Sequence, residues 1–178
     1  KIDSANTIKI TSKLNLYNTK SKVYRQSENT DIDGLLNNNS NNITDNNTDK
    51  TAFSNSILFK HKFKKDRRTF SLNADFNSLT SKNEGYLNSV NNYYTHGVLN
   101  RTDSIDQKKN NDNLSQKLSA RAVYTEPLSK KYSLELNYEL SSVKGENELV
   151  TLSKTIASNS KYDKPVDSLS NNFDQTIV

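Results

Sequence analysis

Residues 132–142 alternate strictly between apolar and polar side chains. Every second residue over most of this stretch is apolar or aromatic: Tyr132, Leu134, Leu136, Tyr138 and Leu140. Polar residues, including Glu135 and Glu139, fill the positions between them. Because successive side chains of a β-strand point to opposite faces, the pattern predicts a strand with one apolar and one polar face.

The same two-residue period occurs in four other complete stretches of the chain. It is clearest at Phe70, Leu72, Ala74 and Phe76, which alternate with serine, asparagine and aspartate. The strands predicted in this way cover residues 7–17, 52–63, 69–77, 114–124 and 132–142, with a sixth, shorter strand at 172–178. An all-β fold follows.

The connections between these strands differ in length. Long polar stretches, predicted as loops, occupy residues 25–50, 78–113 and 144–170, and short basic connections occupy 64–68 and 126–131. Regular alternation of short and long connections is typical of an outer-membrane barrel, whose turns are short at one end. We therefore expect an antiparallel up-and-down meander, a partial transmembrane β-barrel of about six strands.

Composition limits the alternatives. Only 31% of the 178 residues are hydrophobic, and the mean hydropathy is −0.90, which leaves little material for an ordinary core. No window approaches the roughly 18 apolar residues of a membrane helix, whereas a barrel strand needs only about 9 to 11 residues with alternate positions apolar. Because six strands leave two unpaired edges, we expect a curved, open sheet rather than a closed pore.

The pattern assigns side chains to the two faces of the sheet. Residues predicted to face lipid are Phe59, Phe63, Phe70, Leu72, Phe76, Leu118, Tyr124, Tyr132, Leu134, Leu136, Tyr138 and Leu140. Residues predicted to face the lumen are Ser71, Asn73, Asp75, Asn77, Lys117, Ser119, Arg121, Ser133, Glu135, Asn137 and Glu139. If Tyr124 lies opposite Tyr132, Arg121 pairs with Glu135 and Lys117 pairs with Glu139 across the lumen face.

Charge and candidate chemistry change this picture little. The net charge is +5, but the cations concentrate at residues 60–68 and 130–131, which favours solvated turns over a nucleic-acid partner. The chain has no cysteine, and His61 and His96 are far apart, so we expect no metal site and no cofactor. No serine has a plausible catalytic base, and Asp31-Ile-Asp-Gly lacks the remaining ligands of a calcium loop. We expect no catalytic residues and no enzyme activity.

Three stretches resemble one known family. The sequences YTEPLSKKYSLELNYELS at residues 124–141, YDKPVDSLSNNFD at 162–174 and FKHKFKKDRRTFSLNADF at 59–76 are similar to the outer-membrane β-barrel family related to TonB-dependent receptors. The resemblance covers roughly residues 51–178, and its best single feature is the Tyr-Thr-Glu-Pro-Leu turn at 124–128.

The resemblance implies an internal segment of a large barrel that works in uptake across the outer membrane of a Gram-negative cell. Such barrels have about 22 strands and a plug domain. The implied partners are outer-membrane lipid, the remainder of the barrel, a plug domain and a small-molecule or peptide ligand. The absence of methionine also suggests that the chain is part of something longer.

One alternative remains open at this point. A secreted or cell-surface adhesive β-protein, built as a sandwich or a solenoid, would also combine polar alternating strands with loops rich in asparagine and serine. The two hypotheses differ in what covers the apolar face, which is a second protein layer in one and lipid in the other.

Overall fold

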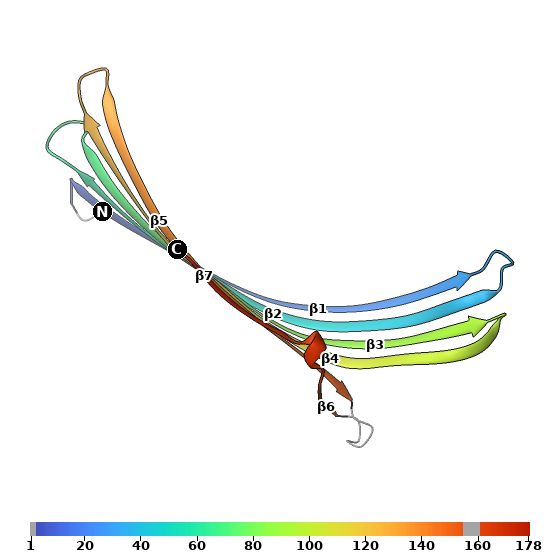
Figure 1. Ribbon diagram of the computed structural model, residues 1–178. Helices are drawn as coiled ribbons and strands as arrows, with labels where there is room; N and C mark the ends of the chain where they lie inside the picture. Colours follow the sequence, from blue (N-terminus) through green and yellow to red (C-terminus); the bar gives the residue numbers. More distant parts are fainter. Residues whose placement is uncertain (1–2, 155–160) are drawn as a thin grey trace.

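The chain forms one long, twisted antiparallel sheet in a computed structural model that describes residues 3–154 and 161–178 (Figure 1). Five long strands follow one another, with two short strands and a 3-10 turn at the end. Their bounds are β1 Asn6–Thr30, β2 Leu36–Lys62, β3 Thr69–Thr95, β4 Val98–Pro127, β5 Ser133–Lys154, β6 Tyr162–Pro165, η1 Asp167–Leu169 and β7 Asn171–Ile177. The predicted all-β, antiparallel meander is confirmed.

Each strand from β1 to β5 pairs with the next one along the chain, and β6 and β7 both pair with the free edge of β5. The two short strands act as one return strand interrupted by η1, because the register of β7 on β5 differs from that of β6 by three residues. Among the described strands, β1 pairs with β2 alone, so the sheet stays open. The predicted open sheet is therefore confirmed.

All six predicted strands lie within observed strands, but five of them are far too short. The predicted strand at 69–77, for example, is the first third of β3, which has 27 residues. Only the prediction for 172–178 has about the right length, because β7 covers Asn171–Ile177. The alternation of apolar residues therefore located each strand and missed most of its extent.

The long loops predicted at 25–50, 78–113 and 144–170 are wrong over most of their described residues, which form the outer halves of β1 to β5 and all of β6. Residues 155–160 of the last predicted loop lie outside the described residues. The physical reason is that a β-ladder is held by backbone hydrogen bonds, which polar residues make as well as apolar ones. When water covers both faces, no alternation of hydrophobicity marks the strand.

Tight turns close the outer ends of these hairpins. His96 and Gly97 connect β3 to β4, and both have positive φ values, of 49° and 77°. Two such residues suit the right-handed twist of paired strands. Between β1 and β2, the carboxylate of Asp31 accepts hydrogen bonds from the backbone of Asp33 at 3.0 Å and of Leu35 at 2.8 Å. Asp31-Ile-Asp-Gly is thus a turn, as the sequence predicted.

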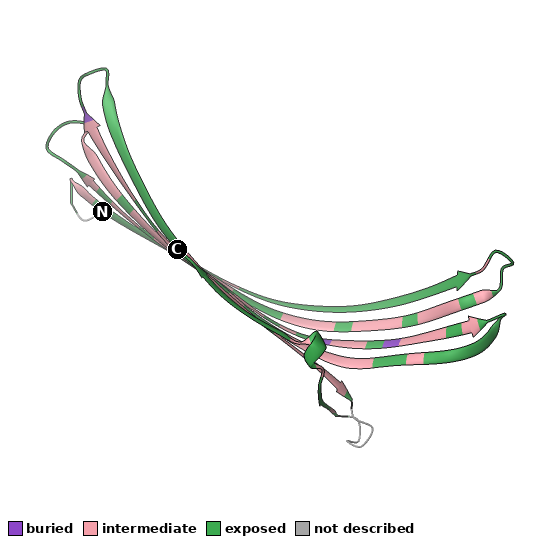
Figure 2. Cartoon of the chain, in the orientation of Figure 1, coloured by how far each residue is buried: buried purple, intermediate pink, exposed green. Residues whose placement is uncertain are grey.

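The sheet is a single layer and therefore has no enclosed core. Among the described residues no hydrophobic side chain is buried, and the one fully buried side chain is Thr151 (Figure 2). Its hydroxyl donates to the backbone oxygen of Leu169 at 2.8 Å, so the η1 turn covers it. No helix in the described part of the chain is long and apolar enough to cross a membrane.

Candidate functional site

The hydrogen-bond register gathers apolar side chains from five strands on one surface of the sheet. One row across the sheet joins Ile8, Phe59, Leu72, Ala122 and Tyr138, and the rows two residues away continue the pattern. We call this surface the apolar face. It holds Phe59, Phe70, Leu72, Phe76, Leu118, Tyr124, Leu134, Leu136, Tyr138 and Leu140 from the sequence prediction, and also Ile8, Ile10, Leu14, Leu16, Phe53 and Ile57.

The two remaining residues of the predicted apolar set lie at the short turns. The ring of Phe63 meets the ring of Tyr124 edge-on, with centroids 6.1 Å apart, which places Phe63 at the end of the apolar face. Tyr132 lies in the turn before β5, where its backbone oxygen accepts a hydrogen bond from Leu128 at 3.0 Å. Contact of these side chains with lipid stays a prediction.

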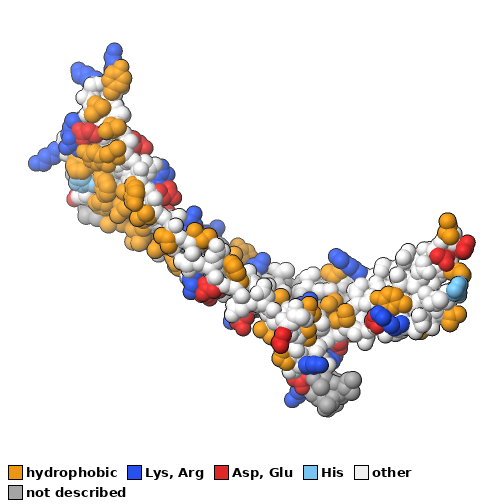
Figure 3. All heavy atoms as spheres, viewed as in Figure 1, with side chains coloured by type: hydrophobic (Ala, Val, Ile, Leu, Met, Phe, Trp, Pro, Cys, Tyr) orange, Lys and Arg blue, Asp and Glu red, His pale blue; other side chains and the backbone are white. Residues whose placement is uncertain are grey.

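The apolar face is open to its surroundings. Ile10 is 64% exposed and Leu136 is 57% exposed, values normal for surface residues and unusual for neighbouring aliphatic side chains in water. The hydrophobic side chains gather over the arm of the molecule that carries the short turns (Figure 3). Such a continuous patch is unfavourable in water and requires an apolar covering.

The boundary of the apolar face crosses the strands obliquely. In β1 the apolar residues end at Leu16, whose row reaches Glu146 in β5, but in β5 they end at Leu140, six residues earlier. Six residues correspond to about 20 Å along a strand, and four strand spacings to about 19 Å across the sheet. The strands therefore incline by about 45° to the band's normal, close to the tilt of about 35 to 45° in membrane barrels.

The opposite surface, which we call the polar face, carries the residues predicted for the lumen. The register brings together Ser71, Asn73, Asp75, Asn77, Lys117, Ser119, Arg121, Ser133, Glu135, Asn137 and Glu139. Hydroxyl, amide and guanidinium groups bond between strands here: Ser56 Oγ donates to Asn73 Oδ1 at 3.3 Å, and Arg121 Nε donates to Asn137 Oδ1 at 3.0 Å.

The predicted charge pairs on the polar face are wrong by a shift of four residues in register. Arg121 lies opposite Glu139 rather than Glu135, and Lys117 lies opposite Val143 rather than Glu139. The ladder runs on into the expected turn as far as Pro127, which pairs with Ser133, so the connection has only five residues, 128–132. Because four is an even number, every side chain keeps its predicted face.

Beyond the apolar band, the same surface becomes charged. Cross-strand ion pairs there join Lys22 with Asp45, Lys82 with Asp112, Lys108 with Glu84 and Lys154 with Asp106, at 3.8, 3.9, 2.7 and 2.5 Å. Lys108 beside Glu84 lowers the pKa of that carboxyl below its usual value. Each strand is thus apolar near the short turns and charged toward the hairpin tips on one surface.

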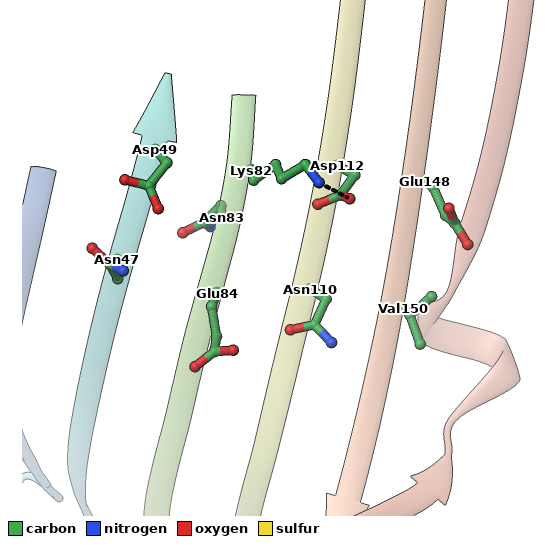
Figure 4. A pocket seen from close by; sticks show the side chains of 9 residues that line it. All are labelled: Asn47, Asp49, Lys82, Asn83, Glu84, Asn110, Asp112, Glu148 and Val150. Carbon is green, nitrogen blue, oxygen red and sulfur yellow. Dashed lines mark ion pairs between the residues drawn. The ribbon is translucent and has the colours of Figure 1, made fainter. Parts of the chain in front are cut away.

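An open groove of about 550 Å³ lies on the charged part of this surface (Figure 4). Asp49, Glu84, Asp112 and Glu148 contribute carboxylates to it, and Lys82 contributes the ammonium group that pairs with Asp112. These groups are exposed to solvent and partly neutralised by their neighbours. They form a hydrated surface rather than a catalytic arrangement.

Glu126 joins the two short turns at the other end of the sheet. Its carboxylate lies 2.6 Å from Lys65 Nζ, accepts a hydrogen bond from Arg68 Nη2 at 2.8 Å and another from Tyr124 Oη at 2.6 Å. Arg68, followed by Lys65, holds the pKa of Glu126 down to about 2. The turn at 63–68 is further tied to the turn at 128–132 because Arg67 Nη1 donates to the backbone oxygen of Lys130 at 3.0 Å.

Sequence reasoning missed this cluster because it assigned residues 126–131 to a turn without considering their partners. A usable signal was present: Glu126 is a lone acidic residue beside an aromatic one and follows a lysine- and arginine-rich turn one hairpin earlier. Only the register shows that the two turns are neighbours.

The histidines have structural surroundings. His61 Nδ1 lies 2.7 Å from Asn6 Oδ1 and its ring packs edge-on against Phe63, whereas His96 occupies the distant β3–β4 turn. In the described ranges, no three histidine, aspartate or glutamate side chains are grouped closely enough to hold a metal ion.

Comparison with known proteins gives one match. A family model described as an outer membrane protein beta-barrel family matches residues 61–176, which is more than half of the chain. The matched region begins at the end of β2 and includes both basic-turn hairpins' later strands and the β6–β7 return strand. No curated protein matches the chain.

Proposed function

The chain belongs to the outer membrane protein beta-barrel family, and on this premise we propose that it forms part of the wall of a transport or receptor barrel related to TonB-dependent receptors. The cell would be Gram-negative, and the segment would have no catalytic role. Outer-membrane lipid would cover the apolar face, and the polar face would line the lumen, in contact with water, a plug domain or a small-molecule or peptide ligand.

The observation that carries the proposal is the exposed apolar face with its oblique boundaries. A sandwich would cover this face with a second sheet, and the described residues supply a single layer. Lipid covers the outside of a membrane barrel, and the inclination of about 45° agrees with the tilt that barrel closure requires. The alternative of a soluble adhesive protein leaves the face without a covering.

The transport assignment draws on size. A strand needs only about 9 to 11 residues to cross the membrane, whereas β1 to β5 each have between 22 and 30. Such strands continue well beyond the bilayer, an arrangement suited to a large barrel that receives a ligand outside the cell. The polar face offers many amide and hydroxyl groups for water or a ligand.

A pair of neighbouring substitutions tests the membrane assignment in the full-length parent. Leu136→Arg places a charge in the middle of the apolar face, where lipid contact makes it cost about 2 to 4 kcal/mol. Asn137→Arg, the matched control, places the same charge on the polar face. We expect the first variant to fail to assemble into the outer membrane and the second to assemble normally, as measured by the amount of heat-modifiable barrel in isolated membranes.

Soluble secretion of Leu136→Arg at the normal level would overturn the barrel proposal. The transport assignment needs a separate test, which compares uptake of a panel of nutrients by cells lacking the parent and by complemented cells. Equal uptake of every nutrient by both would contradict a transport role while leaving the membrane assignment intact.

A further inference from the structure

A cleft lies between the two short turns, at the edge of the apolar face. It has a volume of about 380 Å³ and is lined by Lys65, Asp66, Arg67 and Lys130, together with the turn residues 127–129. Six basic residues, at 64, 65, 67, 68, 130 and 131, surround it with two acidic ones, at 66 and 126. The surplus of positive charge favours an anionic ligand.

Glu126 divides these cations into two groups. Its contacts with Lys65 and Arg68 neutralise part of their charge and fix the two turns against each other. Arg67 instead bonds to the backbone oxygen of Lys130, a neutral acceptor, with one of its five N–H donors. The remaining donors of Arg67 and the ammonium group of Lys130 are thus held at the cleft without a neutralising carboxylate on that bond.

The backbone of Arg67 is in an unfavourable conformation. Its φ of 64° lies in the left-handed region, which costs a side-chain-bearing residue free energy that glycine avoids. Strain of this kind is frequent at binding sites. The position gives the cleft a guanidinium group at the expense of turn stability.

The cleft is continuous with the apolar face. The guanidinium of Arg68 lies 5.8 Å from the centre of the Phe63 ring, and that ring contacts Tyr124 at the end of the apolar face. A ligand bound here would therefore place its anionic group among the turn cations and an apolar part on Phe63. Charge and shape together specify an anionic molecule with hydrocarbon chains.

We propose that this cleft binds the phosphate headgroup of an anionic phospholipid in the leaflet next to the short turns. The inference rests on the proposed function, which places the apolar face in the bilayer. Phosphate suits the site because arginine offers several donors in a planar fork and lysine adds a point charge. The acyl chains would continue along the aromatic rings at the end of the apolar face.

The test uses the full-length parent, purified in detergent and incubated with phosphatidylglycerol and phosphatidylcholine that have identical acyl chains. Native mass spectrometry counts the bound lipids of each kind. We expect the wild type to retain phosphatidylglycerol preferentially, and Arg67→Gly and Lys130→Gln each to lower this preference about fivefold. Raising the salt concentration should weaken it too.

Arg67→Gly separates binding from folding, because glycine relaxes the backbone and should leave the barrel at least as stable as the wild type. Arg25→Gln, which removes one positive charge from the distant strand β1, is the matched control and should keep the wild-type preference. Equal retention of the two lipids by the wild type, or the same loss of preference in Arg25→Gln, would overturn the proposal.

Two further arms identify other sources of the anion. If sodium phosphate alone, at equal concentration, displaces the bound phosphatidylglycerol, the cleft recognises free phosphate and the lipid proposal fails. If an acidic peptide displaces it instead, the cleft is a protein-docking site and the proposal fails likewise. Assembly of the wild type into membranes is scored separately, so failure of the proposed function appears as absence of the barrel rather than as loss of lipid preference.

Discussion

Glu126 shows how much one residue contributes to the arrangement of this sheet. It lies at the end of β4, outside the apolar band, and its carboxylate contacts groups from both short turns. Its side chain is 18% exposed, so the contacts exclude much of the surrounding water. A carboxylate held by two cations is therefore the point at which neighbouring hairpins are joined.

The ion pairs of Glu126 predict a pH dependence. Its pKa is lowered from 4.5 to about 2 in the folded protein, so its ionised form favours folding. The contribution is complete above about pH 4.5, where the carboxyl is ionised in both states, and is lost as the pH falls to about 2. We expect the difference in unfolding temperature between the wild-type parent and Glu126→Gln to be largest at neutral pH and to vanish near pH 2.

A comparable substitution far from the turns provides the control. Glu148→Gln, in the charged groove, also removes one carboxylate but leaves the contacts between the turns in place. If both variants differ from the wild type by the same amount at every pH, general charge removal explains the effect and the contacts of Glu126 contribute nothing specific.

At the scale of elements, the hairpin connecting β3 and β4 depends on its two-residue turn. Gly97 has a φ of 77°, and a side chain in that conformation costs about 1 kcal/mol. We expect Gly97→Ala to open the hairpin tip more often, with amide hydrogen exchange near residues 94–99 accelerated about fivefold. Hydrogen–deuterium exchange with mass spectrometry measures this.

Gly145 provides the matched control in β5. A Cβ atom added there would meet no other atom within 4 Å, and its φ lies outside the left-handed region. Alanine should therefore leave exchange unchanged or slow it slightly, since it reduces the freedom of the unfolded chain. Faster exchange in Gly145→Ala than in Gly97→Ala would contradict the assignment of turn strain.

The elements also show what the sequence could predict. Apolar alternation identified the inner half of β3 from Phe70, Leu72 and Phe76, because only that half has faces in different surroundings. The outer half, from Lys82 to Thr95, is polar on both faces and lacks that period. The backbone ladder to β2 and β4, which holds this half, leaves no mark in local composition.

The candidate site divides in the same way. Membership of the two faces followed from parity alone, so a register error of four residues left it unchanged. The partners of Arg121 and the cluster around Glu126 depend on where the ladder ends and on which turns are neighbours. Neither is encoded in the period of a single strand, and both need the paired structure.

At the scale of the whole molecule, the sheet has a direction. The apolar band lies near the turns at 63–68 and 128–132, and the tips at 31–35 and 96–97 are at the far end (Figure 1). In outer-membrane barrels the short turns face the periplasm and the longer extensions face outward. The hairpin tips should therefore stand outside the cell.

Single cysteines test this orientation, because the chain contains none of its own. In a cysteine-free background of the parent, Asp33→Cys at the first hairpin tip should react with a membrane-impermeant maleimide on intact cells. Asp66→Cys, in a short turn, should react only after the outer membrane is permeabilised. The reverse labelling pattern would mean that the strands run through the membrane in the opposite direction.

The continuous ladder in the outer halves of the strands affects how a partner would bind there. A flexible loop loses about 1 to 2 kcal/mol of backbone conformational entropy for each residue that binding fixes. In this protein the backbone of residues 82–95 is already fixed by hydrogen bonds on both sides. A ligand meeting that surface finds it preorganised, and the entropy penalty was met when the sheet folded.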